Sequence, residues 1–237
     1  IKSETLMKGC LTLVPTPIDD ENPLEQTAFK LLKQAVEKGD IIAVEEAKTC
    51  RRRWLNWGLP REAIQDFVLY NEHTRSDQAA NLIKELSGGK NVFLLSDCGL
   101  PAFCDPGRIL VSLCHESSIK VTATPFPNSI SLAMALSGFN HDRFIFEGFI
   151  PARGSDRAKV LKRILSQKEV SIIMDTPYRL QTLLKEMKAI NSAREVFLGI
   201  DLNSSTEELV RARLGELKIP DGKREFVLVV GGQNERK

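Results

Sequence analysis

The sequence lacks the short glycine-rich motifs that mark the commonest nucleotide-binding and hydrolase sites. No GxGxxG follows the first apolar run, where VPTPIDDENP stands at 14–23, so neither a Rossmann dinucleotide loop nor the glycine-rich turn of the common methyltransferase fold is expected. The P-loop motif of nucleotide hydrolases, GxxxxGK followed by Ser or Thr, is missing. A GxSxG nucleophile elbow with a usable Asp and His is missing too. A ligand must therefore be held by a different kind of loop.

Metal and redox motifs are missing as well. The chain has five Cys, an odd number, and three His that stand far apart. Cys98-x5-Cys104 is not the CxxC of thioredoxins or zinc ribbons. We therefore expect no metal site, and we expect reduced cysteines with a structural role.

Long apolar runs and a strong charge bias are also absent. No run approaches the roughly eighteen residues of a membrane span, and a net charge of +2 is too small to indicate nucleic-acid binding by itself. The densest basic stretch, KTCRRRW at 48–54, suits a solvated helix face and a phosphate-facing one about equally well. The N-terminal residues hold only one short apolar run, so we expect no signal peptide and a cytoplasmic protein.

The chain does contain apolar runs that alternate with amphipathic segments, which predicts an α/β protein. In the first half, short continuous apolar runs predict strands at 11–14, 40–46, 67–70, 91–97 and 119–124. Apolar residues at helical spacing predict helices near 24–38, 47–57, 74–87 and 107–116. Buried strands between helices favour a mostly parallel sheet that is covered on both faces.

A second domain is expected after residue 124, because Pro125 and Pro127 break any continuing element. We predict helices near 128–137, 155–166 and 178–189, and strands near 143–149, 170–175, 195–200 and 225–230. RFIFEGFI, at 143–150, alternates as a half-exposed strand would. The sequence therefore predicts two α/β domains, an N-terminal one over 1–124 and a C-terminal one over 125–237.

Thr-Pro occurs three times at the expected carboxyl end of a strand, at 16–17, 124–125 and 176–177, and Leu100-Pro101 repeats the pattern. Proline lacks the N–H that would extend a ladder and holds its predecessor extended, so each strand should stop there. Ligands of open α/β sheets bind outside the carboxyl ends of the strands. Four such endings from two domains predict a shared cleft.

The loop LLSDCGLPAFCDPG, at 94–107, is the densest feature of the chain. Asp97 ends a buried strand, where a carboxylate suits the hydroxyl or the cation of a ligand. Asp105 is interpreted as the N-cap of the helix that follows Pro106 and Gly107. Backbone groups between 97 and 103 would be fixed without pairing in a ladder, so the loop is expected to recognise a polar ligand through its main chain.

SDCGLPAFCDPG resembles the SDAGTPxISDPG signature of the tetrapyrrole methylase superfamily, in particular its 16S rRNA cytidine 2′-O-methyltransferase I branch. Other stretches agree with that branch in order and spacing: VPTPI (14–18) with ATPIGN, IAVEEAKTCRR (42–52) with AAEDTRxTRR, YNEH (70–73) with YHEH, PFPNS (125–129) with PGPSA, DRFIFEGFIP (142–151) with DRFxFEGFLP, DTPYRL (175–180) with ESPHRL, and REFVLVVGG (224–232) with GEFVLVIxG. The resemblance covers nearly the whole chain.

The resemblance implies two α/β domains with S-adenosylmethionine in the cleft between them, usually in a homodimer. In such proteins the methyl donor is held largely by backbone groups of three segments. Carried over onto this sequence, the cofactor-binding residues are Asp97, Cys98, Leu100, Ser129, Ile130 and Met174.

Methyl transfer requires the acceptor and the sulfonium to be aligned and the acceptor's proton to be removed. The segments that resemble AEDTR and YHEH would face the acceptor. The predicted catalytic residues are Glu46, Lys48 and His73, and the predicted substrate-binding residues are Pro17, Arg51, Glu72 and Glu147. Lys48 and residues 51–54 would offer an RNA strand phosphate contacts and, through Trp54, a stacking surface.

Departures from the family pattern lie on the acceptor side. TPIGN reads TPIDD here, which adds negative charge, EDTR reads EEAK, and RELTKxHEE reads IDLNSSTEE at 200–208. Lys does not replace Arg at a planar contact. The sequence favours a methyltransferase acting on RNA and leaves two alternatives open: a small-molecule acceptor such as a tetrapyrrole, or a paralogue that binds S-adenosylmethionine without methylating.

Overall fold

The computed structural model describes residues 7–126 and 128–233. The chain divides into two compact units, one ending at Phe126 and the other formed by the rest of the chain. The sequence-based boundary after residue 124 lies just before this division. Within the described ranges, every helix is too short or too polar to span a bilayer.

The first unit is built on a five-stranded sheet in which all neighbouring strands run parallel, as predicted. Its strands are β1 (Cys10–Val14), β2 (Ile41–Val44), β3 (Val68–Leu69), β4 (Val92–Leu95) and β5 (Lys120–Ala123). They lie in the order β3-β2-β4-β1-β5. The central strand β4 is buried along its whole length, as expected for a parallel strand with helices on both sides.

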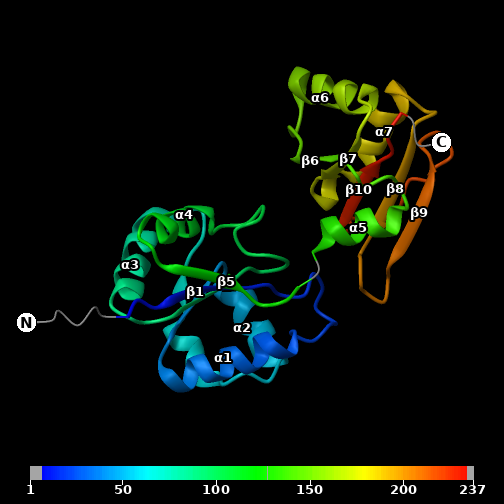
Figure 1. Ribbon diagram of the computed structural model, residues 1–237. Coiled ribbons are helices and arrows are strands. Elements are labelled where there is room, and N and C mark those ends of the chain that lie inside the picture. Colours follow the sequence, from blue (N-terminus) through cyan, green and yellow to red (C-terminus); the bar gives the residue numbers. More distant parts are fainter. Residues whose placement is uncertain (1–6, 127, 234–237) are drawn as a thin grey trace, which may run out of the picture. The chain divides into compact units, whose positions relative to one another are not determined.

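Helices cover both faces of this sheet (Figure 1). They are α1 (Gln26–Lys38), α2 (Ala47–Asn56), α3 (Arg75–Ser87) and α4 (Arg108–Glu116), with a 3-10 helix, η1 (Arg61–Asp66), that the sequence did not predict. Leu32 of α1 and Trp54 of α2 pack in one core with Phe93. Leu82 of α3 and Leu110 of α4 belong to the core on the opposite face.

The winding of this sheet reverses between β1 and β4. The connection from β1 through α1 passes β4 to reach β2, and the connection from β4 through α4 passes β1 to reach β5. Neighbouring strands whose connections leave in opposite directions open a crevice at their carboxyl ends, where α/β sheets bind ligands. The loops that follow β1 and β4 lie at this switch point.

The second unit has a mixed sheet in the order β6-β7-β10-β8-β9. Its strands are β6 (Phe144–Phe149), β7 (Val170–Met174), β8 (Glu195–Ile200), β9 (Glu208–Arg213) and β10 (Phe226–Val230). Only β6 and β7 pair in parallel. The helices are α5 (Ser129–Ser137), α6 (Gly154–Ser166) and α7 (Leu180–Ile190), with a short 3-10 helix, η2 (Pro177–Arg179). Leu161 of α6 and Leu184 of α7 share a core with Leu198 and Leu228, while α5 lies against β8 and β10.

Two features of the second sheet differ from the prediction. Strand β9 was not predicted, because its sequence ELVRAR is an exposed edge strand without an apolar run. The alternation expected for residues 143–150 is wrong, since β6 is half-buried over most of its length. The cause is a register shift between Phe146 and Gly148, which changes the direction of the side chains that follow.

Candidate functional site

The loops after β1 and β4 are bonded to each other at the switch point. The Thr16 N–H donates to the Gly99 carbonyl at 2.9 Å, and the Gly99 N–H donates to the Thr16 carbonyl at 3.0 Å. The Thr16 hydroxyl donates to the Ser96 carbonyl at 3.2 Å, and the Ser96 hydroxyl donates to the Gly99 carbonyl at 2.9 Å. The first of the three Thr-Pro pairs therefore ends β1 and also fixes the loop that follows β4.

Residues 96–107 form a loop whose backbone few sequences can adopt. Gly99, Ala102, Cys104 and Gly107 all have positive φ, with values of 82°, 66°, 65° and 139°. A Cβ added to Gly107 would lie 2.9 Å from the Cβ of Ala102, so only glycine fits there. Ala102 and Cys104 are not glycines, so their left-handed conformation strains the backbone. Backbone strain of this kind is common at functional sites.

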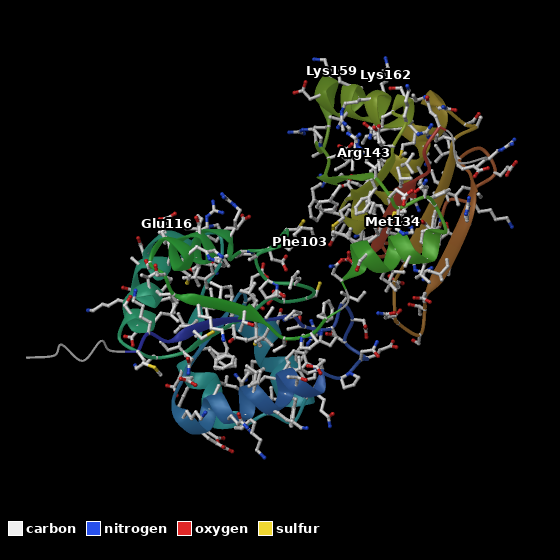
Figure 2. All side chains as sticks on the ribbon, in the orientation of Figure 1. Phe103, Glu116, Met134, Arg143, Lys159 and Lys162 are labelled. Carbon is white, nitrogen blue, oxygen red and sulfur yellow. The ribbon has the colours of Figure 1, made fainter. Side chains whose placement is uncertain are left out.

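This loop also has a backbone donor without a partner in the described chain, and it has exposed side chains. The backbone N–H of Leu100 donates no hydrogen bond to any residue of the described chain, although the Leu100 carbonyl accepts one from Phe103 at 3.2 Å. The Cys98 side chain is exposed, and Phe103 exposes 41 % of its surface (Figure 2). A free donor on a fixed backbone suits a polar ligand, and recognition of a ligand by this loop stays a prediction.

Arg53, in α2, ties two loops together through three backbone carbonyls. Its guanidinium donates to the carbonyls of Pro17 (2.6 Å) and Asp19 (2.8 Å) and also to the carbonyl of Asp97. The guanidinium also lies 5.2 Å from the ring centroid of Trp57. Arg53 is only 5 % exposed, so these charge-assisted bonds are shielded from water. Pro17, a predicted substrate-binding residue, is buried, with its carbonyl bonded to this guanidinium.

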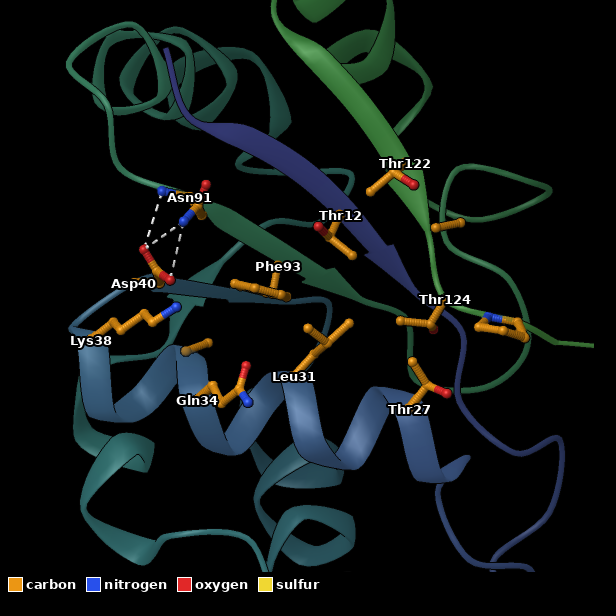
Figure 3. Close-up of a pocket in the computed structure, with 13 residues that line it drawn as sticks. Thr12, Thr27, Leu31, Gln34, Lys38, Asp40, Asn91, Phe93, Thr122 and Thr124 are labelled. Carbon is orange, nitrogen blue, oxygen red and sulfur yellow. Dashed lines mark hydrogen bonds between the residues drawn. The ribbon is translucent and has the colours of Figure 1, made fainter. Parts of the chain in front are cut away.

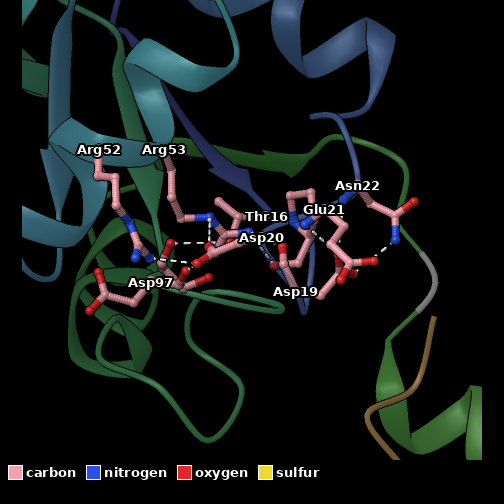
Figure 4. Close-up of polar contacts among 10 residues, drawn as sticks. Thr16, Asp19, Asp20, Glu21, Asn22, Arg52, Arg53 and Asp97 are labelled. Carbon is pink, nitrogen blue, oxygen red and sulfur yellow. Dashed lines mark hydrogen bonds and ion pairs between the residues drawn. The ribbon is translucent and has the colours of Figure 1, made fainter. Parts of the chain in front are cut away.

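The acidic pair Asp19-Asp20, which departs from the family pattern, is neutralised within the first unit (Figure 4). The Asp19 carboxylate accepts hydrogen bonds from the backbone N–H groups of Glu21 (2.7 Å) and Asn22 (2.8 Å). Asp20 pairs with Arg52 at 2.7 Å and with Arg53 at 3.5 Å. Asp19 thus closes a turn, and Asp20 is ion-paired with two arginines of α2.

Three carboxylates gather at the carboxyl ends of β2 and β4. The Asp97 N–H donates to Glu45 at 3.2 Å, and the Asp97 carboxylate accepts from the Glu46 N–H at 3.2 Å. Burial and repulsion by Glu45 raise the pKa of Asp97 to about 6, outweighing the opposing effect of Arg53. Burial, with Glu45 and Asp97, raises the pKa of Asp105 to about 7. This excess of negative charge would be stabilised by a bound cation.

The predicted acceptor-side residues of the first unit lie near these loops. The Glu46 carboxylate caps α2, accepting from the backbone N–H groups of Lys48 (2.9 Å) and Thr49 (2.6 Å). Hydrogen bonds from Thr49 and Lys48 lower the pKa of Glu46, which makes it a weaker proton acceptor near neutral pH. The other four side chains are exposed: Lys48, Arg51, Glu72 and His73. Their roles stay predictions.

In the second unit, the predicted cofactor-binding residues lie at the ends of elements. Ser129 and Ile130 begin α5, which Asn128 caps by accepting from the N–H of Ser131 at 2.9 Å. Met174 is the last residue of β7 and is half-buried. These residues stay predicted contacts of the donor.

A buried ionic network follows Met174, and sequence reasoning did not find it. The Asp175 side chain is completely buried and pairs with Arg157 at 3.1 Å and with Arg179 at 2.6 Å. Arg157 also pairs with Glu186 of α7 at 2.6 Å. The third Thr-Pro turn is thereby fixed to α6 and α7. The DTPYRL motif contained the signal, since it places Asp and Arg four residues apart around a proline.

Glu147, the predicted substrate-binding residue of the second unit, is engaged within that unit. Its carboxylate accepts from Arg163 at 2.6 Å and 2.9 Å and from Gln167 at 2.9 Å. The Glu147 side chain is only 7 % exposed. These bonds hold β6 to α6, and an acceptor role for Glu147 stays a prediction.

Two sequence-based interpretations are wrong. Trp54 is fully buried and its indole N–H donates to the Pro60 carbonyl at 2.8 Å, so neither Trp54 nor the buried Arg53 can form a surface for RNA. Asp105 does not cap α4, because the cap residue is Gly107 and no side chain bonds to the first turn. The sequence placed Trp54 and Arg53 on a basic run but could not show which side of α2 faces the sheet.

The segment that replaces RELTKxHEE, residues 200–208, is ordered by an arginine that the sequence analysis did not single out. Arg224 bonds to Asp201 at 2.7 Å, and it also bonds to the Glu208 carboxylate and to the Thr206 carbonyl. The polar groups of this segment are thus partly used within the second unit.

One cavity of the first unit is distinct from the predicted site. It measures about 330 Å³ and runs along α1 beside β1 and β5, with Thr27, Gln34 and Thr122 in its wall (Figure 3). At one end Asp40 and Asn91 bond to each other at 3.2 Å. None of the predicted site residues lines it. Within the described residues, no group of three or more His, Cys, Asp or Glu side chains could hold a metal ion.

Replacing Arg53 by glutamine is expected to destabilise the first unit by at least about 3 kcal/mol, because three carbonyls lose a bond from a charged donor. The matched variant Arg52→Gln loses one exposed ion pair and should cost less than about 1 kcal/mol. Both tryptophans, Trp54 and Trp57, lie in this unit, so their fluorescence in a urea titration reports its unfolding. Equal losses in the two variants would contradict the role of Arg53.

Replacing Asp105 by asparagine should stabilise the protein more and more as the pH rises from about 4 to about 7. A carboxyl with a raised pKa binds protons more tightly in the folded state, so the wild type loses stability across this window whereas asparagine does not titrate. Urea titrations at each pH measure the difference between the two proteins. The exposed Asp66→Asn serves as the control, and a difference independent of pH would refute the burial of an unpaired Asp105.

Comparison with known proteins identifies the family. The model of the Tetrapyrrole (Corrin/Porphyrin) Methylases matches residues 11–218. The chain is 32 % identical to the ribosomal RNA small subunit methyltransferase I of Escherichia coli O157:H7 over 237 residues, covering 97 % of this chain and 80 % of that protein. It is 30 % identical to the enzyme of the same name from Thermotoga maritima, covering 88 % of this chain and 90 % of that protein.

Solved structures show the same fold at low sequence identity. Diphthine synthase superposes with a TM-score of 0.72 at 16 % identity, covering 96 % of this chain and 92 % of that one. Uroporphyrin III C-methyl transferase from Thermus thermophilus superposes with a TM-score of 0.57 at 16 % identity, covering 94 % of this chain and 97 % of that one. With the two α/β units and the strained loop after β4, these matches show that the chain belongs to the tetrapyrrole methylase family and is a methyltransferase that uses S-adenosylmethionine.

Proposed function

We propose that the protein methylates RNA, transferring the methyl group of S-adenosylmethionine to a ribose hydroxyl of ribosomal RNA. The names of its relatives and the motifs shared with the 2′-O-methyltransferase branch support this acceptor. The structural observation that carries the proposal is the set of carboxylates, Glu45, Asp97 and Asp105, beside the loop at the switch point.

The residues of this loop fit the cofactor. S-adenosylmethionine has a positively charged sulfonium and ammonium group, and the loop offers carboxylates without enough cations to neutralise them. The Leu100 N–H, free within the described chain, suits an acceptor atom of the cofactor. When bound, the cofactor supplies a methyl group activated by the sulfonium. Asp97, Cys98 and Leu100 would hold it in the first unit, and Ser129, Ile130 and Met174 are the predicted contacts in the second.

The protein's own contribution to the reaction is alignment and proton removal. Arg53, from α2, ties the loop after β1 to the loop after β4, which sets the position of Asp97. Among the predicted catalytic residues, Glu46 is engaged as a helix cap, whereas His73 and Lys48 have exposed side chains. We therefore favour His73 as the proton acceptor, because its exposed imidazole can act as a general base.

The altered acceptor segment TPIDD is compatible with an RNA acceptor. Asp20 is paired with Arg52 and Arg53, and Asp19 is held in a turn, so the substitution adds little free negative charge. Arg51, which precedes Arg52 in the sequence, is exposed and stays a predicted phosphate contact. We place the protein in the cytoplasm because its named relatives are bacterial ribosomal RNA methyltransferases.

We also propose a homodimer, which the family resemblance implied. Light scattering after size-exclusion chromatography should give twice the chain mass of 26.5 kDa. A single-chain mass at micromolar concentration would contradict this assembly, and it would leave the methyl-transfer reaction to be tested separately.

Replacing Asp97 by asparagine should weaken S-adenosylmethionine binding by about tenfold or more, because a charged hydrogen-bond partner is lost. The asparagine keeps an oxygen for the Glu46 N–H, so the fold should persist. Calorimetry measures the affinity, and the exposed Asp66→Asn is the control. Wild-type affinity should rise between about pH 5 and pH 8, as Asp97 and Asp105 ionise, and the variant should show a weaker rise. An unchanged affinity in folded Asp97→Asn would refute the role of Asp97.

Labelled S-adenosylmethionine tests the reaction itself. Small-subunit ribosomal RNA from a strain lacking its own methyltransferase of this type should acquire label on a ribose oxygen. Label in a tetrapyrrole and not in RNA would favour the small-molecule alternative. Cofactor binding without transfer to either pool would favour the paralogue that does not methylate.

A further inference from the structure

A second cavity of the first unit lies where α3 and α4 begin. It measures about 230 Å³ and is lined by residues between Tyr70 and Arg75 and between Ala102 and Ile109; we call it the Tyr70 cavity. Sites that enclose a drug-sized ligand usually measure about 300–1,000 Å³. The Tyr70 cavity therefore suits one group of a larger ligand, not a whole cofactor.

Tyr70 brings an unsatisfied polar atom to this cavity. The side chain is 0 % exposed, and its hydroxyl has no hydrogen-bond partner of normal geometry among the described residues. The hydroxyl lies close to the backbone of Leu110 in the first turn of α4 and feels the charge of Arg75. Buried hydroxyls are nearly always bonded, so this one points to a partner that a ligand or a water supplies.

Two arginines give the cavity its positive side. Arg75 and Arg108 are the first residues of α3 and α4, and both line the cavity with exposed side chains. Within the described chain, neither guanidinium forms an ion pair or a hydrogen bond. No side chain caps either helix, although the N–H of Arg75 donates to the Asn71 carbonyl at 2.9 Å. Two free guanidinium groups beside two uncapped helix N-termini suit an oxyanion, above all a phosphate.

The cavity also adjoins the loop assigned to the methyl donor. Asp105 lines it and is close enough to Asp97 and Glu45 for their charges to raise its pKa to about 7. Asp105 and the exposed Glu72 are carboxylates of the same lining, so the two arginines must hold an anion against them. Phe103, two residues earlier, adds an exposed aromatic ring of the kind that stacks on bases.

We propose that the Tyr70 cavity binds one phosphate group of the RNA acceptor strand, held by Arg75 and Arg108 and by a hydrogen bond from the Tyr70 hydroxyl. The inference rests on the proposed function and names the contact that would fix the strand next to the donor loop. Contacts to phosphate set the register of a strand and carry no sequence information. Binding through this cavity should therefore be strong, dependent on salt and tolerant of base sequence.

The test uses a fluorescent single-stranded oligoribonucleotide and the full chain, with affinity measured by anisotropy over a range of salt. Arg75→Gln and Arg108→Gln should each weaken binding by about tenfold and reduce the salt slope by about 1. Arg61→Gln, an exposed arginine of η1 outside the cavity, should change neither quantity. Calorimetry should show the same S-adenosylmethionine affinity in all four proteins.

Tyr70→Phe separates binding from folding. It removes a hydroxyl that has no partner in the fold, so the melting temperature should stay the same or rise. Oligonucleotide affinity should fall about fivefold if the hydroxyl bonds to the phosphate. Unchanged affinity in this variant and in both arginine variants would overturn the proposal.

Two further outcomes separate this inference from the proposed function. If the wild type methylates RNA and the arginine variants have the same KM for RNA as the wild type, the proposed role of the cavity is wrong and the proposed function still holds. A wild type that binds the oligonucleotide through these arginines but methylates no RNA would support the cavity and refute the function. Binding of inorganic phosphate that the arginine variants abolish, with RNA affinity unchanged, would show a free-anion site and overturn the proposal.

Discussion

The Arg53 guanidinium is the interaction on which the candidate site depends. It donates to carbonyls of the loop after β1 and of the loop after β4, and it comes from the helix that follows β2. Backbone carbonyls in loops otherwise depend on water, which lets loops move. A buried cation with a rigid fork of donors replaces that water and makes three chain segments one body. Asp97 belongs to this body, so its position is set before any ligand arrives.

Holding the loops in this way brings carboxylates together. Glu45 and Asp97 are bonded through the Asp97 N–H, and Asp105 is near enough to be affected by both. Such crowding costs free energy in the folded protein, as the raised pKa values of Asp97 and Asp105 show. A cationic cofactor would relieve that cost, which gives the folded site an electrostatic reason to bind a sulfonium. The strained backbone around Gly107 belongs to the same loop, so strain and charge occur together.

Much of the fold was predictable because its strongest signals are local. Apolar runs located every strand of the first unit and four of the five strands of the second. The missing strand, β9, is an edge strand whose exposed Glu208 and Arg213 gave no apolar run. The family was predictable from the order of motifs along the chain, of which SDCGLPAFCDPG is the most specific. Asp97 was selected because a carboxylate at the tip of a buried strand suits a ligand's hydroxyl or cation, and its contact with the donor stays a prediction.

Residue roles that depend on distant contacts could not be read from the chain. Each of the four residues at 51–54 could have belonged to an RNA-binding surface. Only the packing of α2 against the sheet shows that Arg53 and Trp54 are buried. The cap of α4 depends on a φ of 139° at Gly107, which no residue pattern announces. The two arginines of the Tyr70 cavity, Arg75 and Arg108, are 33 residues apart in the sequence (108 − 75), so they carried no local signal. The sequence by itself determined the elements, the family and the loop that matters, because periodicity and motifs are local properties. Tertiary structure alone decided which charges are buried, which are paired and which stay free, because those depend on neighbours that the chain brings together only when it folds.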